Sequence, residues 1–149
     1  MQKIGYLVII LLIGILVYIK YPRKINKTIN QEIGNQSFSL ELANNSYLQA
    51  KGLSGRDHLC PECGMLFVFS RETTQTFWMK NTLIPLDIIF INSNNQITDI
   101  YTASPQPGKS DFQLTLYQST APSIYVIELN AGLAQKLNLK PGDKIDLNL

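Results

Sequence analysis

Polar and hydrophobic residues alternate along much of the chain after residue 37, which is the pattern of strands with one buried face. Phe38, Leu40 and Leu42, for example, alternate with Ser39 and Glu41. Short runs without polar residues are typical of strands buried inside a fold. The sequence thus predicts seven or eight short strands, drawn from residues 38–42, 65–69, 76–80, 85–91, 96–102, 112–116, 123–129 and 145–147.

Two short helices are expected between these strands. Asn44 and Asn45 are good N-cap residues for a helix over residues 46–51, and Gly52 can end it. Residues 130–137 predict a second helix of about two turns. No strand–helix unit repeats, so the sequence predicts a mostly β fold, a β sandwich or barrel, with two short helices. The expected core contains Phe67, Phe69, Ile89, Val126 and Leu129.

The N-terminal segment has the composition of a transmembrane helix. Residues 4–19 contain no charged residue and no proline, and most of them are Ile, Leu or Val. As a helix they would extend about 24 Å at ~1.5 Å per residue, close to the roughly 30 Å hydrocarbon core of a bilayer. No small-residue cleavage signal follows them. We therefore expect an uncleaved signal anchor, with a cleaved signal peptide or a buried soluble helix as alternatives.

A polar segment separates this anchor from the strands. Residues 22–36 are rich in Lys, Asn and Gln, which is typical of a tether. Ile25, Ile29 and Ile33 are spaced by four, so a short juxtamembrane helix is the alternative. The predicted organisation is an anchor over residues 1–21, a polar linker over 22–36 and a globular domain over 37–149.

Charge is distributed unevenly along the chain. Residues 1–34 carry five of the 13 basic residues and one of the 11 acidic residues. Residues 35–149 are slightly acidic and have no basic stripe, so we expect no nucleic-acid binding. The bases that follow the anchor favour a cytoplasmic domain by the positive-inside rule, but that rule weakens when a domain of this length follows.

Several motifs of the globular part resemble the domain-of-unknown-function 192 family. They are Gly-Met-Leu-Phe-Val-Phe at 64–69, Phe-Trp-Met-Lys-Asn-Thr at 77–82, Ile-Pro-Leu-Asp-Ile-Ile-Phe at 84–90, Val-Ile-Glu-Leu-Asn-Ala-Gly at 126–132, Lys-Gly-Leu at 51–53 and Pro-Gly-Asp at 141–143. The resemblance covers roughly residues 38–147. It implies a small β-rich bacterial domain, often behind a signal or membrane segment, with no established activity. On this resemblance we expect the domain on the outer side of the cell membrane.

The best candidate for a site follows the strand at 76–80. Trp78 and Lys80 would share one face of that strand, with Asn81 and Thr82 at its end, where sites are often built. Asp87 and Glu128 are carboxylates in otherwise apolar strands, which is costly unless they are paired or exposed. The predicted ligand-binding residues are Trp78, Lys80, Asn81, Thr82, Asp87 and Glu128. In the alternative, Lys80 pairs with one of the two acids and Asn81-Thr82 only forms a turn.

Cys60 and Cys63 form a Cys-Pro-Glu-Cys motif where the family usually has an acidic or neutral loop. We favour a disulfide that closes a short loop in an oxidising compartment. A zinc site would need His58 and an acid such as Asp57 as further ligands. A redox-active pair would be expected at a helix N-terminus. Two inert thiols are the remaining alternative. We expect no cofactor, and zinc at this motif is the minor alternative.

The sequence supports binding better than catalysis. It has one histidine, no Gly-x-Ser-x-Gly motif and no phosphate-binding glycine loop, so no catalytic residue is predicted. Our leading hypothesis is a membrane-tethered module of the cell envelope that binds a small ligand or peptide, with residues 4–19 in contact with membrane lipid. The alternatives are an assembly partner of another envelope protein and, with less support, an enzyme of unknown reaction.

Overall fold

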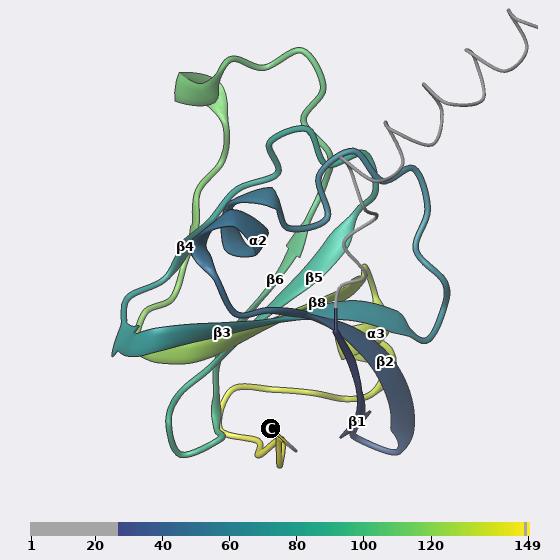
Figure 1. Cartoon of the computed structure of the whole chain (residues 1–149), viewed down its shortest axis with the longest axis vertical. Coiled ribbons are helices and arrows are strands. Elements are labelled where there is room, and N and C mark those ends of the chain that lie inside the picture. Colours follow the sequence, from purple (N-terminus) through teal and green to yellow (C-terminus); the bar gives the residue numbers. More distant parts are fainter. Residues whose placement is uncertain (1–26, 148) are drawn as a thin grey trace, which may run out of the picture.

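Strands dominate the structure, a computed structural model that describes residues 27–147 and residue 149 (Figure 1). The strands are β1 (Thr28–Ile33), β2 (Gln36–Ala43), β3 (Cys63–Thr73), β4 (Thr76–Phe77), β5 (Leu86–Ile91), β6 (Ile97–Ala103), β7 (Tyr117–Gln118) and β8 (Ser123–Asn130). The helices are α2 (Ser46–Lys51), the 3-10 helix η1 (Asp111–Gln113) and α3 (Leu133–Lys136). The expected anchor at 4–19 lies outside the described residues, among which no helix is long and apolar enough to cross a membrane.

β8 lies in the middle of the main sheet, whose strand order is β1-β2-β3-β8-β5-β6. It pairs antiparallel with β3 on one side and with β5 on the other, whereas β2 and β3 are parallel. β4 and β7 form a separate two-stranded sheet. The predicted mostly β fold with two short α-helices is confirmed, and it takes the form of one six-stranded sheet with a much smaller second sheet.

The two faces of the main sheet bury two different clusters of side chains. One cluster contains Ile89 and Leu129 and is covered by α3 and the C-terminal segment. The other contains Phe67 and Val126, with Phe69 packed against it, and is covered by α2, β4 and β7. Figure 1 shows α2 above the sheet and the C-terminal segment, in yellow, below it. The expected single core is therefore wrong, because adjacent residues of a buried strand point to opposite faces.

β1 occupies most of the predicted linker. It pairs antiparallel with β2, with Ile29 opposite Leu40. Ile33 and Gln31 are both buried, and the amide of Gln31 donates to the carbonyl of Asp146 at 2.7 Å. The linker prediction over 28–33 is thus wrong, because a polar side chain stands at an inward position and hides the alternation of the strand.

Both ends of α2 lie where the sequence predicts them. The side chain of Asn45 accepts a hydrogen bond from the Leu48 N–H at 3.0 Å and caps α2, which ends at Gly52 with φ of 49°. The strands predicted at 85–91 and 96–102 form β5 and β6, which pair antiparallel.

Three alternating segments did not become full strands. The strand expected at 76–80 ends at Phe77. Residues 112–116 include part of η1, and Phe112 is fully exposed. Residues 145–147 follow a single bridge between Gln96 and Lys144. Alternation alone does not supply a partner strand, and these segments have none along most of their length.

Candidate functional site

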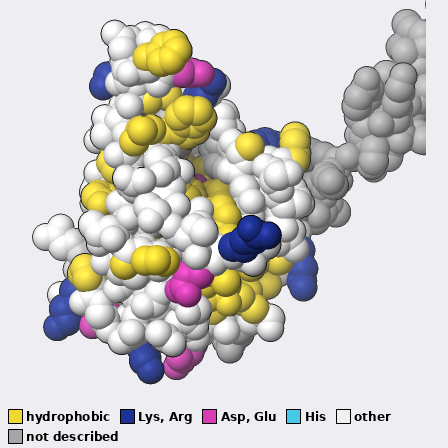
Figure 2. Space-filling model, turned by 90° about the vertical axis from the view of Figure 1, so that its left-hand side faces the viewer, with side chains coloured by type: hydrophobic (Ala, Val, Ile, Leu, Met, Phe, Trp, Pro, Cys, Tyr) yellow, Lys and Arg dark blue, Asp and Glu magenta, His cyan; other side chains and the backbone are white. Residues whose placement is uncertain are grey.

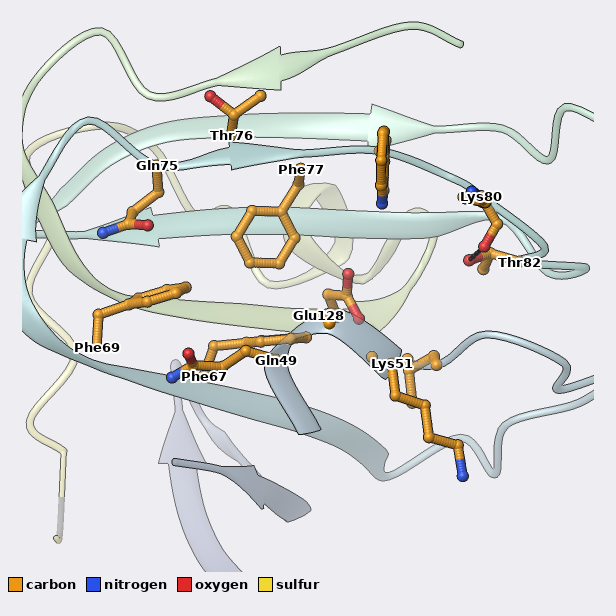
Figure 3. A pocket seen from close by; sticks show the side chains of 14 residues that line it. Gln49, Lys51, Phe67, Phe69, Gln75, Thr76, Phe77, Lys80, Thr82 and Glu128 are labelled. Carbon is orange, nitrogen blue, oxygen red and sulfur yellow. Dashed lines mark hydrogen bonds between the residues drawn. The ribbon is translucent and has the colours of Figure 1, made fainter. Parts of the chain in front are cut away.

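A pocket of about 250 Å³ lies between β3 and β8 of the main sheet and the segments that cover them, which are α2 and the residues around β4. Figure 3 shows aromatic side chains along its walls and Glu128 near its middle. The lining residues come from α2 and the turn after it, from β3, from the segment around β4, and from β8. They are Gln49, Ala50, Lys51, Gly52, Leu53, Phe67, Phe69, Gln75, Thr76, Phe77, Trp78, Lys80, Thr82 and Glu128.

Glu128 is the buried acid of this pocket. It stands on the central strand opposite Met65 of β3 and Ile88 of β5, both of which are buried and apolar. The Glu128 side chain is only 5 % exposed, and its Oε2 atom has no hydrogen-bond partner among the described residues. Burial raises the pKa of this carboxyl to about 8, because the charged form loses its hydration.

Aromatic rings form the apolar wall of the pocket. Phe77 packs edge-on against Phe67, with ring centroids 4.9 Å apart, and against Phe69, with centroids 6.3 Å apart. Phe77 also contacts Phe90 in the buried cluster at 5.6 Å. Edge-to-face contacts of this kind fix the ring orientations, so the wall is preformed rather than flexible.

Two glutamines line the pocket with their amide nitrogens already in use. The Gln49 amide donates to the carbonyl of Val68 at 2.8 Å. The Gln75 amide donates to Thr73 Oγ1 at 3.1 Å and to the carbonyl of Ser123 at 3.2 Å. Each amide oxygen remains without a donor among the described residues. The glutamines therefore offer acceptors to a ligand.

Lys80 and Trp78 stand at the rim. The Lys80 ammonium forms an ion pair with Asp111 of η1 and lies 5.4 Å from the Trp78 ring centroid. Trp78 is 45 % exposed. Thr82 is buried, and its hydroxyl donates to the Lys80 carbonyl at 3.4 Å.

The pocket brings together four of the six predicted ligand-binding residues, namely Trp78, Lys80, Thr82 and Glu128. Asn81 is not among its lining residues. Its backbone is left-handed, with φ of 53°, and its carbonyl accepts from the Gly55 N–H at 2.8 Å, so it forms a turn. Lys80 pairs with Asp111 and with neither of the acids considered from the sequence.

Asp87 lies on the opposite face of the sheet and is not part of the pocket. Its carboxylate is fully buried and accepts hydrogen bonds from Thr102 Oγ1 at 2.7 Å and from the Ala134 N–H at 2.8 Å. The structure therefore does not bring Asp87 and Glu128 together, although both were candidates for one site. Asp87 instead fixes α3 to the sheet.

Cys60 and Cys63 are joined in a disulfide, with their Cα atoms 5.0 Å apart. The loop is tied to β8 by the Asn130 amide, which donates to the Cys60 carbonyl at 2.9 Å. The exposed His58 contacts its neighbour Asp57 at 2.8 Å. Across the described part of the chain no three His, Cys, Asp or Glu side chains meet in a metal-binding group.

The sequence reasoning missed the residues that close the pocket from α2 and β3. Gln49 belongs to a helix that was correctly predicted, but nothing in the local pattern shows that its amide reaches Val68. Gly52 was identified only as a helix end, yet a Cβ there would lie 3.8 Å from Glu128 Oε2. The Lys-Gly-Leu motif at 51–53 was the available signal for this side of the site.

The chain is similar to two bacterial proteins of known structure. A protein of unknown function from Novosphingobium aromaticivorans DSM 12444 is 35 % identical with a TM-score of 0.70, and the match covers 85 % of this chain and 89 % of that one. A "putative transcription regulator" from Sinorhizobium meliloti 1021 is 37 % identical with a TM-score of 0.67, and that match covers 74 % and 82 % of the two chains. No curated protein matches.

The family comparison covers nearly all of the described residues. The model of domain-of-unknown-function 192, whose description is "Uncharacterized ACR", matches residues 27–147. This match includes β1, which the motifs quoted from the sequence did not reach. The chain therefore belongs to the domain-of-unknown-function 192 family.

Proposed function

We propose that this domain is a binding module that takes a small organic molecule into the pocket around Glu128. The single observation that carries the proposal is the Oε2 atom of Glu128, which is buried in an aromatic pocket without a partner among residues 27–147 and 149. A buried polar atom without a hydrogen bond costs about 1–3 kcal/mol of stability. A ligand that completes this hydrogen bond would remove the cost.

The shape and lining of the pocket support the same reading. Small-molecule sites are concave, mostly apolar, and carry a few polar groups that orient the ligand. Here Phe67, Phe69 and Phe77 supply a fixed apolar wall, and Glu128 with Gln49 supplies polar atoms. The volume of about 250 Å³ suits a compact ligand rather than a folded partner.

Catalysis receives less support from this geometry. Acid–base reactions on paired carboxylates need two such groups in one cleft, and Asp87 lies on the other face of the sheet. The other charged groups of the pocket are Lys51 and Lys80, and the Lys80 ammonium is engaged by Asp111. Binding without turnover is therefore the better proposal.

Trp78 provides a direct test of ligand binding. It is the only tryptophan in the chain and it lines the pocket, so its fluorescence reports on occupancy. We expect a library of small organic fragments to contain compounds that change this fluorescence saturably in the purified full-length chain. Glu128→Leu keeps a side chain of similar size and removes the carboxyl, so it should abolish binding of the compounds that depend on this acid. A library without a single saturable binder would overturn the proposal.

We further propose that residues 4–19 anchor the domain and that it faces the outside of the cell membrane. The Cys60–Cys63 disulfide supports this side, because disulfides persist in oxidising compartments. An alkaline phosphatase fused after Leu149 should be active in intact cells, since that enzyme folds only outside the cytoplasm. A fluorescent protein that folds only inside the cytoplasm is the matched control, and the reverse pattern would place the domain inside.

The second candidate partner is an envelope protein, because one loop exposes large apolar side chains. Phe112 is fully exposed and Leu116 is 61 % exposed, both between β6 and β7. Figure 2 shows one face of the domain, on which apolar side chains (yellow) are exposed at several places. If this loop docks a protein, Phe112→Ser with Leu116→Ser should abolish a crosslinked complex in cells and leave fragment binding at Trp78 unchanged.

We propose no nucleic-acid binding for this chain, although a related structure is described as a regulator of transcription. Residues 35–149 hold eight basic and ten acidic residues. A domain that neutralises phosphates needs clustered Lys and Arg. A DNA-binding measurement at low salt should give no complex.

A further inference from the structure

We propose that the ligand of this pocket is a small organic ammonium ion, a protonated amine on an apolar body, with its N–H groups directed at the Glu128 carboxyl. This inference rests on the proposed binding function and names the chemical class that the pocket selects. It is carried by the hydrogen-bonding groups that the pocket leaves unused.

With Glu128 ionised, the unused polar atoms of this acid, of both glutamines and of Thr82 are acceptors. The remaining donors of the pocket, the Lys51 ammonium and the Thr76 hydroxyl, point away from Glu128 in Figure 3. Glu128 Oε2 has no partner in the described part of the chain, and the amide nitrogens of Gln49 and Gln75 are directed to protein acceptors. Figure 3 shows the Gln75 oxygen on the side of Phe77 and its nitrogen turned away. The Thr82 hydroxyl uses its hydrogen on a backbone carbonyl, which leaves its lone pairs. A ligand must therefore bring donors, and an ammonium group brings up to three.

The charges around Glu128 also permit a cation to enter. The pocket has two basic residues, Lys51 on α2 and Lys80 after β4. Lys80 is compensated by its ion pair with Asp111. The Lys51 ammonium points away from Glu128 in Figure 3. Neither lysine thus satisfies the buried carboxyl, which keeps its capacity for a ligand cation.

The aromatic wall suits both parts of such a ligand. Phe67, Phe69 and Phe77 can bury an apolar body. The faces of aromatic rings also attract cations, and this attraction is stronger where the cation is desolvated. An anionic ligand would instead meet carboxyl and amide oxygens.

Protonation of Glu128 gives the binding a characteristic pH dependence. In the empty pocket, burial raises the pKa of the Glu128 carboxyl to about 8. At neutral pH this carboxyl therefore carries a proton, which a bound cation must displace. An aliphatic amine stays protonated to about pH 10, as a lysine does. Affinity should therefore rise as the pH increases from 6 to 8.5. Lys51 and Lys80 are the other charged side chains of the pocket, and both are unchanged in a Glu128→Gln variant.

The test compares three probes that share one ring and differ in charge, namely 2-phenylethylamine, 2-phenylethanol and phenylacetate. Each is titrated into the purified full-length chain at pH 8.5, with Trp78 fluorescence and amide NMR shifts as readouts. We expect the amine to bind at least about tenfold more tightly than the alcohol, since a hydrogen bond between two charged groups is stronger than one from a neutral hydroxyl. Phenylacetate should bind more weakly than the alcohol.

Two variants assign the effect to Glu128. Glu128→Gln should remove the preference for the amine and its pH dependence, while the alcohol binds as before and circular dichroism shows an intact fold. Glu62→Gln makes the same change at an exposed position outside the pocket and should leave the preference unchanged. If the alcohol or phenylacetate binds as well as the amine, the ammonium inference fails and the binding function stands. If none of the three binds at millimolar concentration while other library fragments do, the ammonium inference fails and the proposed binding function stands. If nothing binds, both fail.

Discussion

Asp87 and Glu128 lie on neighbouring strands, one residue apart in register, and therefore point to opposite faces of the main sheet. Glu128 is paired with Ile88, while Asp87 is paired with Leu129. Asp87 satisfies its carboxylate with Thr102 and the α3 backbone, whereas Glu128 keeps an unpaired oxygen. One buried acid thus stabilises the fold and the other is available for a ligand.

The first prediction concerns Asp87. Asp87→Ala removes the acceptor for Thr102 Oγ1 and for the Ala134 N–H, so it should lower the free energy of unfolding by about 2–4 kcal/mol. Denaturant unfolding measures this loss. Thr102→Val, which removes one donor, should cost less. A folded Asp87→Ala variant should still bind pocket ligands, and a stability equal to that of the wild type would contradict the structural role of Asp87.

The second prediction concerns the pH dependence of stability. Burial raises the pKa of Glu128 from 4.5 in the unfolded chain to about 8 in the folded protein. Between these values the folded state holds a proton that the unfolded state has released. The Glu128 contribution therefore falls as the pH rises through this range, by up to about 1.4 kcal/mol per pH unit.

Glu128→Gln isolates this contribution, because the amide does not titrate. The difference in unfolding free energy between the variant and the wild type should grow in favour of the variant from pH 5 to pH 8.5. It should stay constant above that. Parallel stability curves for the two proteins would show that the carboxyl is not desolvated in the folded state.

The third prediction compares two phenylalanines with opposite environments. Phe67 is 1 % exposed and packs against Phe77, so Phe67→Ala should cost about 3–5 kcal/mol. Phe112 is fully exposed, and Phe112→Ala should leave the melting temperature within about 1 °C of the wild-type value. A large loss at Phe112 would mean that its loop packs against the domain in solution.

The fourth prediction concerns the disulfide. The purified, unreduced and denatured protein should have no titratable thiol, because its two cysteines are joined. Cys60→Ser with Cys63→Ser should destabilise the domain by less than the ~3 kcal/mol expected for a 15-residue loop, since this loop is much shorter. Zinc analysis of the same sample should give less than one ion per chain, and two free thiols would contradict the bond.

Sequence patterns predicted those features whose causes are local. Asn45 and Gly52 determine the ends of α2 through hydrogen bonding and backbone preference within one turn. Glu128 was identified as a candidate because a carboxylate in an apolar run is costly wherever it stands. In both cases the physical reason lies within a few residues of the chain.

The features that were missed depend on contacts between distant segments. Gln31 is buried because its amide reaches Asp146 near the other end of the chain, and no local pattern shows this. The separation of Asp87 from Glu128 depends on the register between β5 and β8. The pocket likewise needs α2, β3 and β8 to be assembled before its glutamines can be placed.

The central position of β8 determines how the chain can fold as it is made. β8 is the last in sequence of the eight strands that the structure describes, yet both β3 and β5 pair with it. Until residue 130 has emerged from the ribosome or the secretion channel, β1-β2-β3 and β5-β6 are two separate half-sheets, each with an unpaired inner edge. Such edges are sites of aggregation, so the nascent chain should depend on a holding chaperone until synthesis is nearly finished. A chain truncated before residue 123 would leave the two halves unjoined, and the domain would be degraded rather than partly active.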